Sequence, residues 1–195
     1  MDLYTFGKNL FKSYFSVFYR IEVIGADNLP KDGGILLCSN HINNLDPPLV
    51  GACAPRRVHF MAKAELFNVP LLKHALPRVG AFPVKRGMSD KQALRSGLSI
   101  LKENKVLGLF PEGTRSKNGE LGKGLAGAGF FALRTDAYIV PCAIIGPYKL
   151  FNKVKIIYGE PIDFTEFREQ KKSVEEATEY IMNSIKSLID QHSND

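Results

Sequence analysis

Residues 35–48 read ILLCSNHINNLDPP, and this stretch decides how the rest of the chain is understood. The apolar run at 35–38 predicts a buried strand. The polar residues after it predict a loop that carries His41. Asp46 followed by Pro47 predicts a helix start, because aspartate caps a first turn and proline lacks only an N–H that is unsatisfied there. We therefore expect a strand, a short loop and a helix in direct succession.

The loop in this stretch can fold back and bring His41 and Asp46 together. An aspartate that accepts a hydrogen bond from Nδ1 of a histidine fixes the ring tautomer and leaves Nε2 as a base. The spacing alone is a weak signal, because chance produces it often in a chain with this many aspartates. A loop histidine bonded to a carboxylate for structural reasons is the alternative, so a catalytic interpretation needs support from the rest of the chain.

The totals indicate one globular domain with a basic surface. The chain has 195 residues, of which 45% are hydrophobic and 24% are charged, and its net charge is +6. Such an excess favours an anionic partner, which is a nucleic acid, a membrane surface or a phosphorylated substrate. The three cysteines lie in apolar segments without a Cys-x-x-Cys pair, which is typical of buried thiols in a reducing compartment.

The first residues predict a helix at 3–19 that is rich in aromatic and aliphatic side chains and interrupted by Lys8, Lys12 and Arg20 at its end. No cleavable signal is expected, and no stretch approaches the ~20 apolar residues that span a bilayer. The pattern favours a helix lying in a membrane interface. Packing of its aromatic face onto the domain is the alternative. We expect an interfacial helix at 1–20 and one catalytic domain at 21–195.

The remaining segments alternate between strand and helix patterns. The predicted strands are 21–24, 58–62, 78–84, 106–110, 138–145 and 154–158. The predicted helices are 46–54, 66–76 interrupted by Pro70, 89–104 capped by Ser89, a short one near 130–133, and 174–190. This order predicts a single α/β domain with a largely parallel mixed sheet flanked by helices, preceded by the amphipathic aromatic-rich N-terminal helix.

Polar side chains follow four of the predicted strands: His41, Lys63, Arg86 and the run 112–115. Ligands of such sheets bind at the carboxyl ends of the strands, so this clustering strengthens the case for His41. Lys63 and Arg86 could equally be surface charges.

The loop at 112–115 has its own signals. Arg115 follows Gly113 and Thr114, where backbone N–H groups, a hydroxyl and a guanidinium suit an anion such as phosphate. Glu112 is expected either to bond substrate hydroxyls or to orient Arg115. Five glycines between 119 and 129 predict a hinge, a close approach to substrate or a plain flexible loop.

Several chemistries are disfavoured by the motifs that the chain lacks. It has no Gly-x-Ser-x-Gly elbow for a serine hydrolase and no nucleotide-phosphate loop. His41 and Asp46 lack further ligands at metal spacing, so no metal site is expected. Cys38 lies close to His41, but its place in an apolar strand favours burial over nucleophilic catalysis. No module or basic-aromatic stripe supports nucleic-acid binding.

Four motif blocks stand in order along the chain: Asn40-His41-x-x-x-x-Asp46, Gly80–Arg86 (GAFPVKR), Phe110–Ser116 (FPEGTRS) and Val140–Ile144 (VPCAI). Together they resemble the four motif blocks of the glycerolipid acyltransferase family, and most of all those of its bacterial 1-acyl-sn-glycerol-3-phosphate acyltransferases. Met61–Phe67 resembles the family's segment between the first and second blocks. Many members carry a transmembrane segment before the first block, and this chain shows none there.

The resemblance implies transfer of a fatty acyl group from a thioester to the 2-hydroxyl of lysophosphatidic acid, which gives phosphatidic acid in phospholipid biosynthesis. It implies His41 as the base and Asp46 as its partner. It also implies Arg86, Glu112, Gly113, Thr114 and Arg115 at the phosphate end of the acceptor, where we expect Lys63 to add a second charge. No acyl-enzyme is needed, which agrees with the missing nucleophile elbow.

The expected partners are lysophosphatidic acid, an anionic membrane surface, and acyl-CoA or acyl carrier protein as donor, with no further cofactor. The expected place is the cytoplasmic face of the cell membrane, bound peripherally or as a monotopic protein. Two alternatives stay open. One is an acyltransferase that acts on another lysophospholipid, and the other is a non-catalytic domain that binds anionic lipid.

Overall fold

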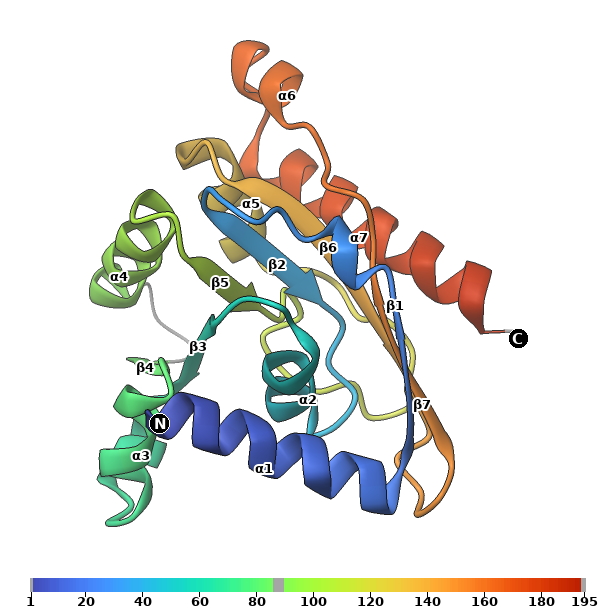
Figure 1. Cartoon of the computed structure of the whole chain (residues 1–195). Coiled ribbons are helices and arrows are strands. Elements are labelled where there is room, and N and C mark those ends of the chain that lie inside the picture. The colour runs from blue at the N-terminus through green and yellow to red at the C-terminus, as the bar shows by residue number, and fades with distance from the viewer. Residues whose placement is uncertain (1, 86–89, 194–195) are drawn as a thin grey trace.

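The structure is a computed structural model that describes residues 2–85 and 90–193 (Figure 1). The helical elements are α1 (Leu3–Phe18), η1 (Ala26–Asn28), α2 (Asp46–Cys53), η2 (Ala64–Asn68), α3 (Leu72–Arg78), α4 (Lys91–Lys102), α5 (Gly127–Arg134), α6 (Thr165–Glu169) and α7 (Val174–His192). The strands are β1 (Arg20–Ile24), β2 (Ile35–Ser39), β3 (Val58–Lys63), β4 (Phe82–Val84), β5 (Val106–Leu109), β6 (Tyr138–Ile145) and β7 (Lys153–Tyr158).

The strands form one sheet in the order β1-β7-β6-β2-β5-β3-β4. All neighbouring pairs are parallel except β6 and β7, which are antiparallel. The five strands β2 to β6 therefore run in one direction, and β1 and β7 run in the other. The largely parallel mixed sheet expected from the sequence is confirmed, and the carboxyl ends of β2 to β6 share one edge.

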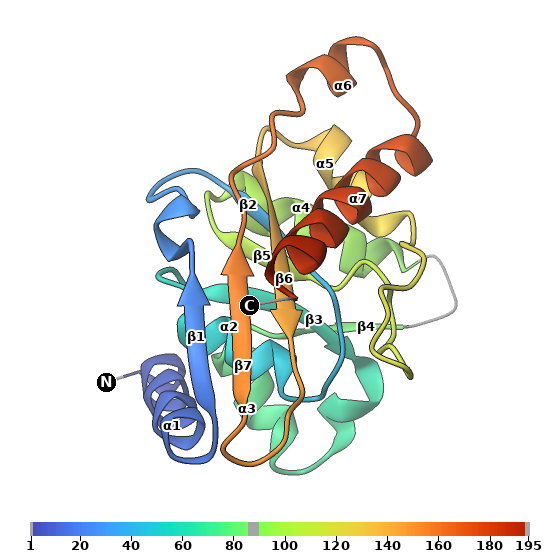
Figure 2. The same cartoon turned by 90° about the vertical axis from the view of Figure 1, so that its right-hand side faces the viewer.

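Two hydrophobic clusters fill the two faces of this sheet. Along β2, Ile35 and Leu37 belong to one cluster, and Leu36 and Cys38 belong to the other, as alternate residues of a strand must. The first cluster includes residues of α1 and α2, and the second includes residues of α4, α5 and α7. The helices thus cover both faces, which is why β2 has no exposed side and reads as a continuous apolar run (Figures 1 and 2).

The segment between β3 and α4 departs most from the sequence expectations. The helical segment predicted at 66–76 with a break at Pro70 is two elements on either side of that proline, the 3-10 helix η2 and the α-helix α3. The predicted strand at 78–84 is correct only over its last three residues. Helix α3 continues through Pro77, so Arg78 ends a helix instead of starting a strand. Helix α4 is capped by Asp90, whose carboxylate accepts hydrogen bonds from the N–H groups of Gln92 and Ala93. The predicted cap, Ser89, lies outside the described residues. Short apolar runs around proline leave the type of element ambiguous.

The helices include one that the sequence did not predict and, among the described residues, none that could span a membrane. The short helix α6 was not predicted from the sequence. Across residues 2–85 and 90–193, no helix combines the length and the apolar content that crossing a bilayer requires.

Candidate active site

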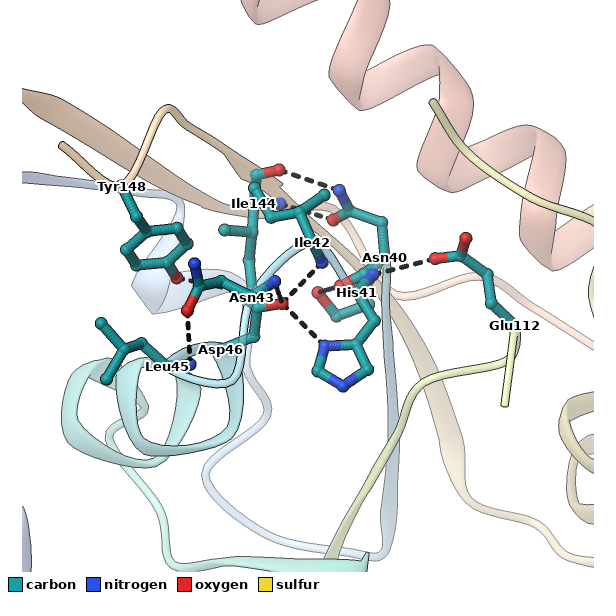
Figure 3. Close-up of polar contacts among 10 residues, drawn as sticks. Asn40, His41, Ile42, Asn43, Leu45, Asp46, Glu112, Ile144 and Tyr148 are labelled. Atoms are coloured by element: carbon teal, nitrogen blue, oxygen red, sulfur yellow. Dashed lines mark hydrogen bonds and ion pairs between the residues drawn. The ribbon is translucent and has the colours of Figure 1, made fainter. Parts of the chain in front are cut away.

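His41 and Asp46 meet in the loop between β2 and α2 (Figure 3). His41 Nδ1 lies 2.7 Å from Asp46 Oδ2. A carboxylate can only accept, so Nδ1 donates and Nε2 is the unprotonated nitrogen of the neutral ring. His41 is only 8% exposed, yet its ring lines a cavity. The pair therefore has the arrangement of a base with an orienting carboxylate.

The carboxylate of Asp46 is fully buried and its acceptor capacity is filled. Besides His41, its Oδ2 accepts hydrogen bonds from the backbone N–H groups of Ile42 and Asn43, both at 2.7 Å. Its Oδ1 accepts a hydrogen bond from the hydroxyl of Tyr148, also at 2.7 Å. Four donors offset the cost of removing this group from water.

The prediction that Asp46 caps α2 is wrong in detail. Leu45 occupies the cap position without a side-chain bond, and Asp46 lies in the first turn with Pro47 behind it. Its carboxylate turns back to the preceding loop, where it bonds N–H groups that no helix satisfies. The same residue types that signal a helix start therefore also serve to fold the histidine loop.

Tyr148 is the site residue that sequence reasoning missed. It follows β6 and lies 102 positions from Asp46, so no local spacing could reveal the contact. Burial raises the pKa of its phenol, and the negative charge of Asp46 raises that pKa further. The hydroxyl thus remains a donor. The Tyr148 ring contacts the ring of Tyr19 just after α1, with centroids 5.8 Å apart and nearly perpendicular planes.

The backbone of His41 is fixed on both sides by the loop that follows β5. Its N–H donates to Glu112 Oε1 at 2.9 Å, and its carbonyl accepts from the N–H of Ser116 at 2.8 Å. Its ring stacks on Phe110, with centroids 4.2 Å apart. Asn40 exchanges two hydrogen bonds with the backbone of Ile144, at 2.7 and 2.8 Å, which continues the pairing of β2 with β6. These contacts leave the imidazole little freedom to turn.

Glu112 is occupied by protein backbone on both oxygens. Oε1 accepts from His41, and Oε2 accepts from the N–H of Gly122 at 2.8 Å. A Cβ at position 122 would lie 2.9 Å from that oxygen, so glycine permits this close approach. Glu112 therefore joins the glycine-containing loop to the histidine loop. Its predicted role as a substrate contact remains a prediction, and its contacts favour a positioning role.

The cavity beside His41 has a volume of about 730 Å³ and a cationic side. Lys63, at the end of β3, lines it together with Gly113, Thr114 and Arg115. The side chains of Lys63 and Arg115 are exposed, and neither forms an ion pair or a side-chain hydrogen bond within residues 2–85 and 90–193. The structure thus brings these four predicted residues to the cavity that His41 lines. Arg86, which was also predicted here, lies outside the described residues.

The rest of the cavity wall is mainly apolar. It comes from α1, α2, β3 and the η2–α3 segment: Phe11, Pro47, Pro48, Phe60, Met61, Leu66, Leu72, Ala75, Leu76 and Val79 among others. A cavity with apolar walls and a few charged groups on one side suits an amphiphilic ligand.

Helix α1 is a structural part of this wall. Its Phe15 is buried in the core, and the hydroxyl of Tyr4 accepts a hydrogen bond from the N–H of Val58 at 3.0 Å. Lys8 donates to the carbonyl of Ala54 at the end of α2, at 2.5 Å. The helix therefore packs onto the domain, as the alternative interpretation of its sequence predicted, while several of its apolar side chains stay exposed.

Neither the thiols of Cys38 and Cys142 nor a cluster of metal ligands adds to the site in the described part of the chain. Cys38 and Cys142 are buried, and burial raises the pKa of each thiol, to about 12 for Cys142. Cys38 also packs in the hydrophobic cluster on one face of the sheet, whereas α2, which lines the cavity, packs in the cluster on the other face. Its thiol is therefore no candidate nucleophile. Within the described ranges, no three His, Cys, Asp or Glu side chains gather as metal ligands.

Known proteins share both the sequence pattern and the fold. The Acyltransferase family matches residues 20–145. The 1-acyl-sn-glycerol-3-phosphate acyltransferase of Bacillus subtilis is 32% identical over 194 residues, covering 95% of this chain and 96% of that protein. A chloroplastic 1-acyl-sn-glycerol-3-phosphate acyltransferase of Arabidopsis thaliana is 31% identical over 158 residues, covering 74% of this chain but only 44% of the plant protein.

A solved structure agrees over nearly the whole chain. PlsC of Thermotoga maritima, a 1-acyl-sn-glycerophosphate acyltransferase, superposes with a TM-score of 0.76 at 25% identity, covering 97% of this chain and 78% of the other. The protein belongs to the Acyltransferase family. The family resemblance and the fold class drawn from the sequence are thus confirmed.

Proposed function

We propose that the protein transfers a fatty acyl group from an acyl thioester to the 2-hydroxyl of lysophosphatidic acid, which gives phosphatidic acid. One observation carries this proposal. An imidazole oriented by a buried carboxylate lines an apolar cavity that also presents two exposed cations, Lys63 and Arg115. The names of the relatives in Bacillus and Thermotoga support the same substrate.

The reaction is a direct transfer in which His41 is the base. The acceptor hydroxyl attacks the thioester carbonyl carbon while Nε2 takes its proton, so an imidazolium forms beside Asp46. The C–S bond then breaks, and the imidazolium returns the proton to the departing thiolate. A positioned base supplies roughly 10²–10⁴-fold, so holding the two substrates in place supplies much of the remaining acceleration.

The glycerol phosphate end of the acceptor binds at the cationic side of the cavity. Arg115 offers a planar guanidinium to the phosphate, and Lys63 adds a second charge. Thr114 lies beside them and offers its backbone N–H and its hydroxyl, whereas the N–H of the adjacent Gly113 donates to the carbonyl of Phe110 at 3.0 Å. Arg86 is assigned to the same role from the family resemblance alone.

Two further residues hold the base in place without touching substrate. Glu112 fixes the backbone of His41, and Tyr148 fixes the second oxygen of Asp46. We assign both as positioning residues. The apolar part of the cavity, which α1 helps to close, receives an acyl chain.

Helix α1 also supplies contact with an anionic membrane surface. Leu3, Phe6, Leu10 and Val17 recur at helical spacing and are all exposed. Deleting residues 1–19 would remove the buried Phe15 with them, so substitution is the sharper test. Phe6→Gln with Leu10→Gln is expected to weaken co-sedimentation with anionic vesicles. Ser13→Gln, a change of similar size on the same helix, is the matched control.

The decisive experiment incubates the purified protein with labelled lysophosphatidic acid and an acyl thioester. We expect phosphatidic acid and one free thiol per transfer, both absent with His41→Ala. Acyl-CoA and acyl carrier protein are compared as donors in parallel. Faster acylation of a lysophospholipid with a larger head group would favour the alternative acceptor. Lipid binding without turnover would favour a non-catalytic lipid-binding domain.

A further inference from the structure

The tip of the β6–β7 hairpin, residues 149–152, has side chains that the catalytic site does not explain. Leu150 is 60% exposed and Phe151 is 64% exposed. Phe151 also has a φ of 62°, in the left-handed region that disfavours bulky side chains. Glycine or asparagine suits this backbone better. Neither burial nor backbone preference accounts for a phenylalanine here, which indicates a role outside the folded chain itself.

Hydrogen bonds hold this tip against the end of α1. The N–H of Phe151 donates to the carbonyl of Phe18 at 2.8 Å, and the N–H of Arg20 donates to the carbonyl of Asn152 at 3.0 Å. Phe18 and the nearby Val17 are themselves exposed. The tip and the end of α1 therefore lie side by side, and both present exposed apolar side chains.

Exposed apolar side chains concentrate at this end of the molecule. Eleven of the fifteen large hydrophobic residues exposed in the described part of the chain belong to α1, the η2–α3 segment and the hairpin tip: Leu3, Phe6, Leu10, Phe11, Val17, Phe18, Leu66, Val69, Leu71, Leu150 and Phe151. In both views these three segments lie at the lower end of the molecule, away from α6 (Figures 1 and 2). Such concentration marks an interaction surface.

The charges around the tip are basic. Lys149 and Arg20 are exposed beside it, and residues 146–153 contain no aspartate or glutamate. Lys153 pairs with Glu22 at 3.0 Å, farther along the strands. Apolar side chains flanked by lysine and arginine fit the boundary between acyl chains and anionic head groups.

We propose that residues 149–152 insert into the head-group region of an anionic bilayer and form a second membrane contact beside α1. The proposal rests on the proposed function only in that a lipid acceptor requires access to a bilayer. The hairpin tip is then a membrane contact separate from the N-terminal helix. It also explains why an aromatic residue stands in a backbone conformation that it disfavours.

The first test uses the absence of tryptophan from the chain. Phe151→Trp places a single indole at the tip, and Tyr138→Trp places one at the other end of β6, where the native side chain is 48% exposed. Vesicles of equal parts phosphatidylcholine and phosphatidylglycerol are added to each. We expect a blue shift and quenching by brominated lipid for Phe151→Trp only. Equal responses, or none at the tip, would overturn the proposal.

The second test separates membrane contact from folding. Asparagine tolerates left-handed backbone, so Phe151→Asn is expected to leave the melting temperature unchanged or raise it. Leu150→Asn with Phe151→Asn is expected to weaken binding to the same vesicles by about tenfold or more. Undiminished vesicle binding would contradict the proposal.

Phosphatidic acid formation in detergent micelles keeps the two proposals distinct. The double variant is expected to match the unchanged protein there, because its substitutions lie outside the cavity. If the unchanged protein forms no phosphatidic acid, the proposed function fails, and vesicle binding still decides the role of the tip.

Discussion

Two cavities in the described part of the chain are similar in size and each has a histidine and basic residues, but only one of the two has the features of an active site. The first, of about 730 Å³, lies beside His41. The second, of about 750 Å³, is lined by Arg56, Arg57, His59 and Lys105 near the amino ends of β3 and β5.

The difference lies in what holds the side chains. His59 Nδ1 is 3.2 Å from the carbonyl oxygen of Val106, whereas His41 has a carboxylate partner. Arg56 donates to the carbonyls of Pro30 and Asn104, and Lys105 pairs with Glu103. The basic groups of the second cavity are therefore bonded to other protein groups, whereas Lys63 and Arg115 of the first form no ion pair or side-chain hydrogen bond within residues 2–85 and 90–193. Residue type alone does not identify the site; the partners of each side chain do.

The largest expected difference is in turnover, between variants of His41 in the first cavity and of His59 in the second. His41→Ala is expected to lower turnover about 10³-fold or more, since it removes the base. The fold should remain, because Asp46 keeps its hydrogen bonds from Ile42, Asn43 and Tyr148. His59→Ala should leave turnover within about twofold. Initial rates of phosphatidic acid formation and melting temperatures measure both. Similar losses for the two variants would contradict the comparison.

The next largest difference is expected between Arg115 of the first cavity and Arg56 of the second. Replacing Arg115 should change the Michaelis constant and not the turnover. Arg115→Ala is expected to raise the Michaelis constant for lysophosphatidic acid about tenfold or more, because a charge-assisted phosphate contact is lost. Lys117→Ala, an exposed cation of the same loop that does not line the cavity, is the matched control. Arg56→Ala should instead lower the free energy of unfolding by about 1 kcal/mol. An unchanged Michaelis constant for Arg115→Ala would remove its assigned role.

Tyr148→Phe tests the positioning of Asp46 with a smaller effect. Loss of one hydrogen bond of about 1 kcal/mol predicts about fivefold slower turnover, with the ring packing on Tyr19 retained. The Michaelis constant for lysophosphatidic acid should stay unchanged, because the substitution displaces the base and leaves the cationic side of the cavity intact. Initial rates at varied substrate measure both constants. A lower melting temperature with unchanged turnover would indicate a purely structural tyrosine.

The smallest effect concerns stability against pH at the second cavity. Burial holds the pKa of His59 below its ordinary value near 6.5. As the pH falls from neutral through 6.5, the unfolded chain binds a proton that the folded chain does not, so the free energy of unfolding decreases. His59→Gln should make this decrease shallower, by less than about 1 kcal/mol because the ring is only partly buried. Urea unfolding across that pH range measures it, and an identical slope would contradict the assignment.

The sequence was sufficient for the histidine loop because its signals are local. The apolar run of β2, the polar loop and the Asp-Pro step specify adjacent elements, and the strand ends place Lys63 and Arg115 at one edge. The contacts of Glu112 and Tyr148 could not be predicted from local sequence, for different reasons. Glu112 was noticed, but its partners His41 and Gly122 depend on how two loops meet. Tyr148 reaches Asp46 only through the turn that follows β6.

The sequence-based prediction of the elements between β3 and α4 was partly wrong, and the reason is physical. Its residues form part of the cavity wall, so apolar side chains there face a cavity and not a packed core. In the sequence, apolar residues that line a cavity give the same pattern as apolar residues that pack in a core. Pro70 marked the division between η2 and α3, but the 3-10 form of η2 and the extension of α3 through Pro77 had no clear local signature.

The direction of β1 and β7 has one more consequence. Because both run against β2 to β6, the chain leaves α1 and turns from β6 into β7 at the edge where the catalytic loops begin. The proposed membrane contacts and the candidate active site thus lie on one side of the protein. In the proposed orientation, acceptor and product belong to the same leaflet, and repeated cycles proceed while the enzyme stays docked. Activity should then follow the time spent on the bilayer, and a stronger anchor should yield longer runs of turnover per encounter.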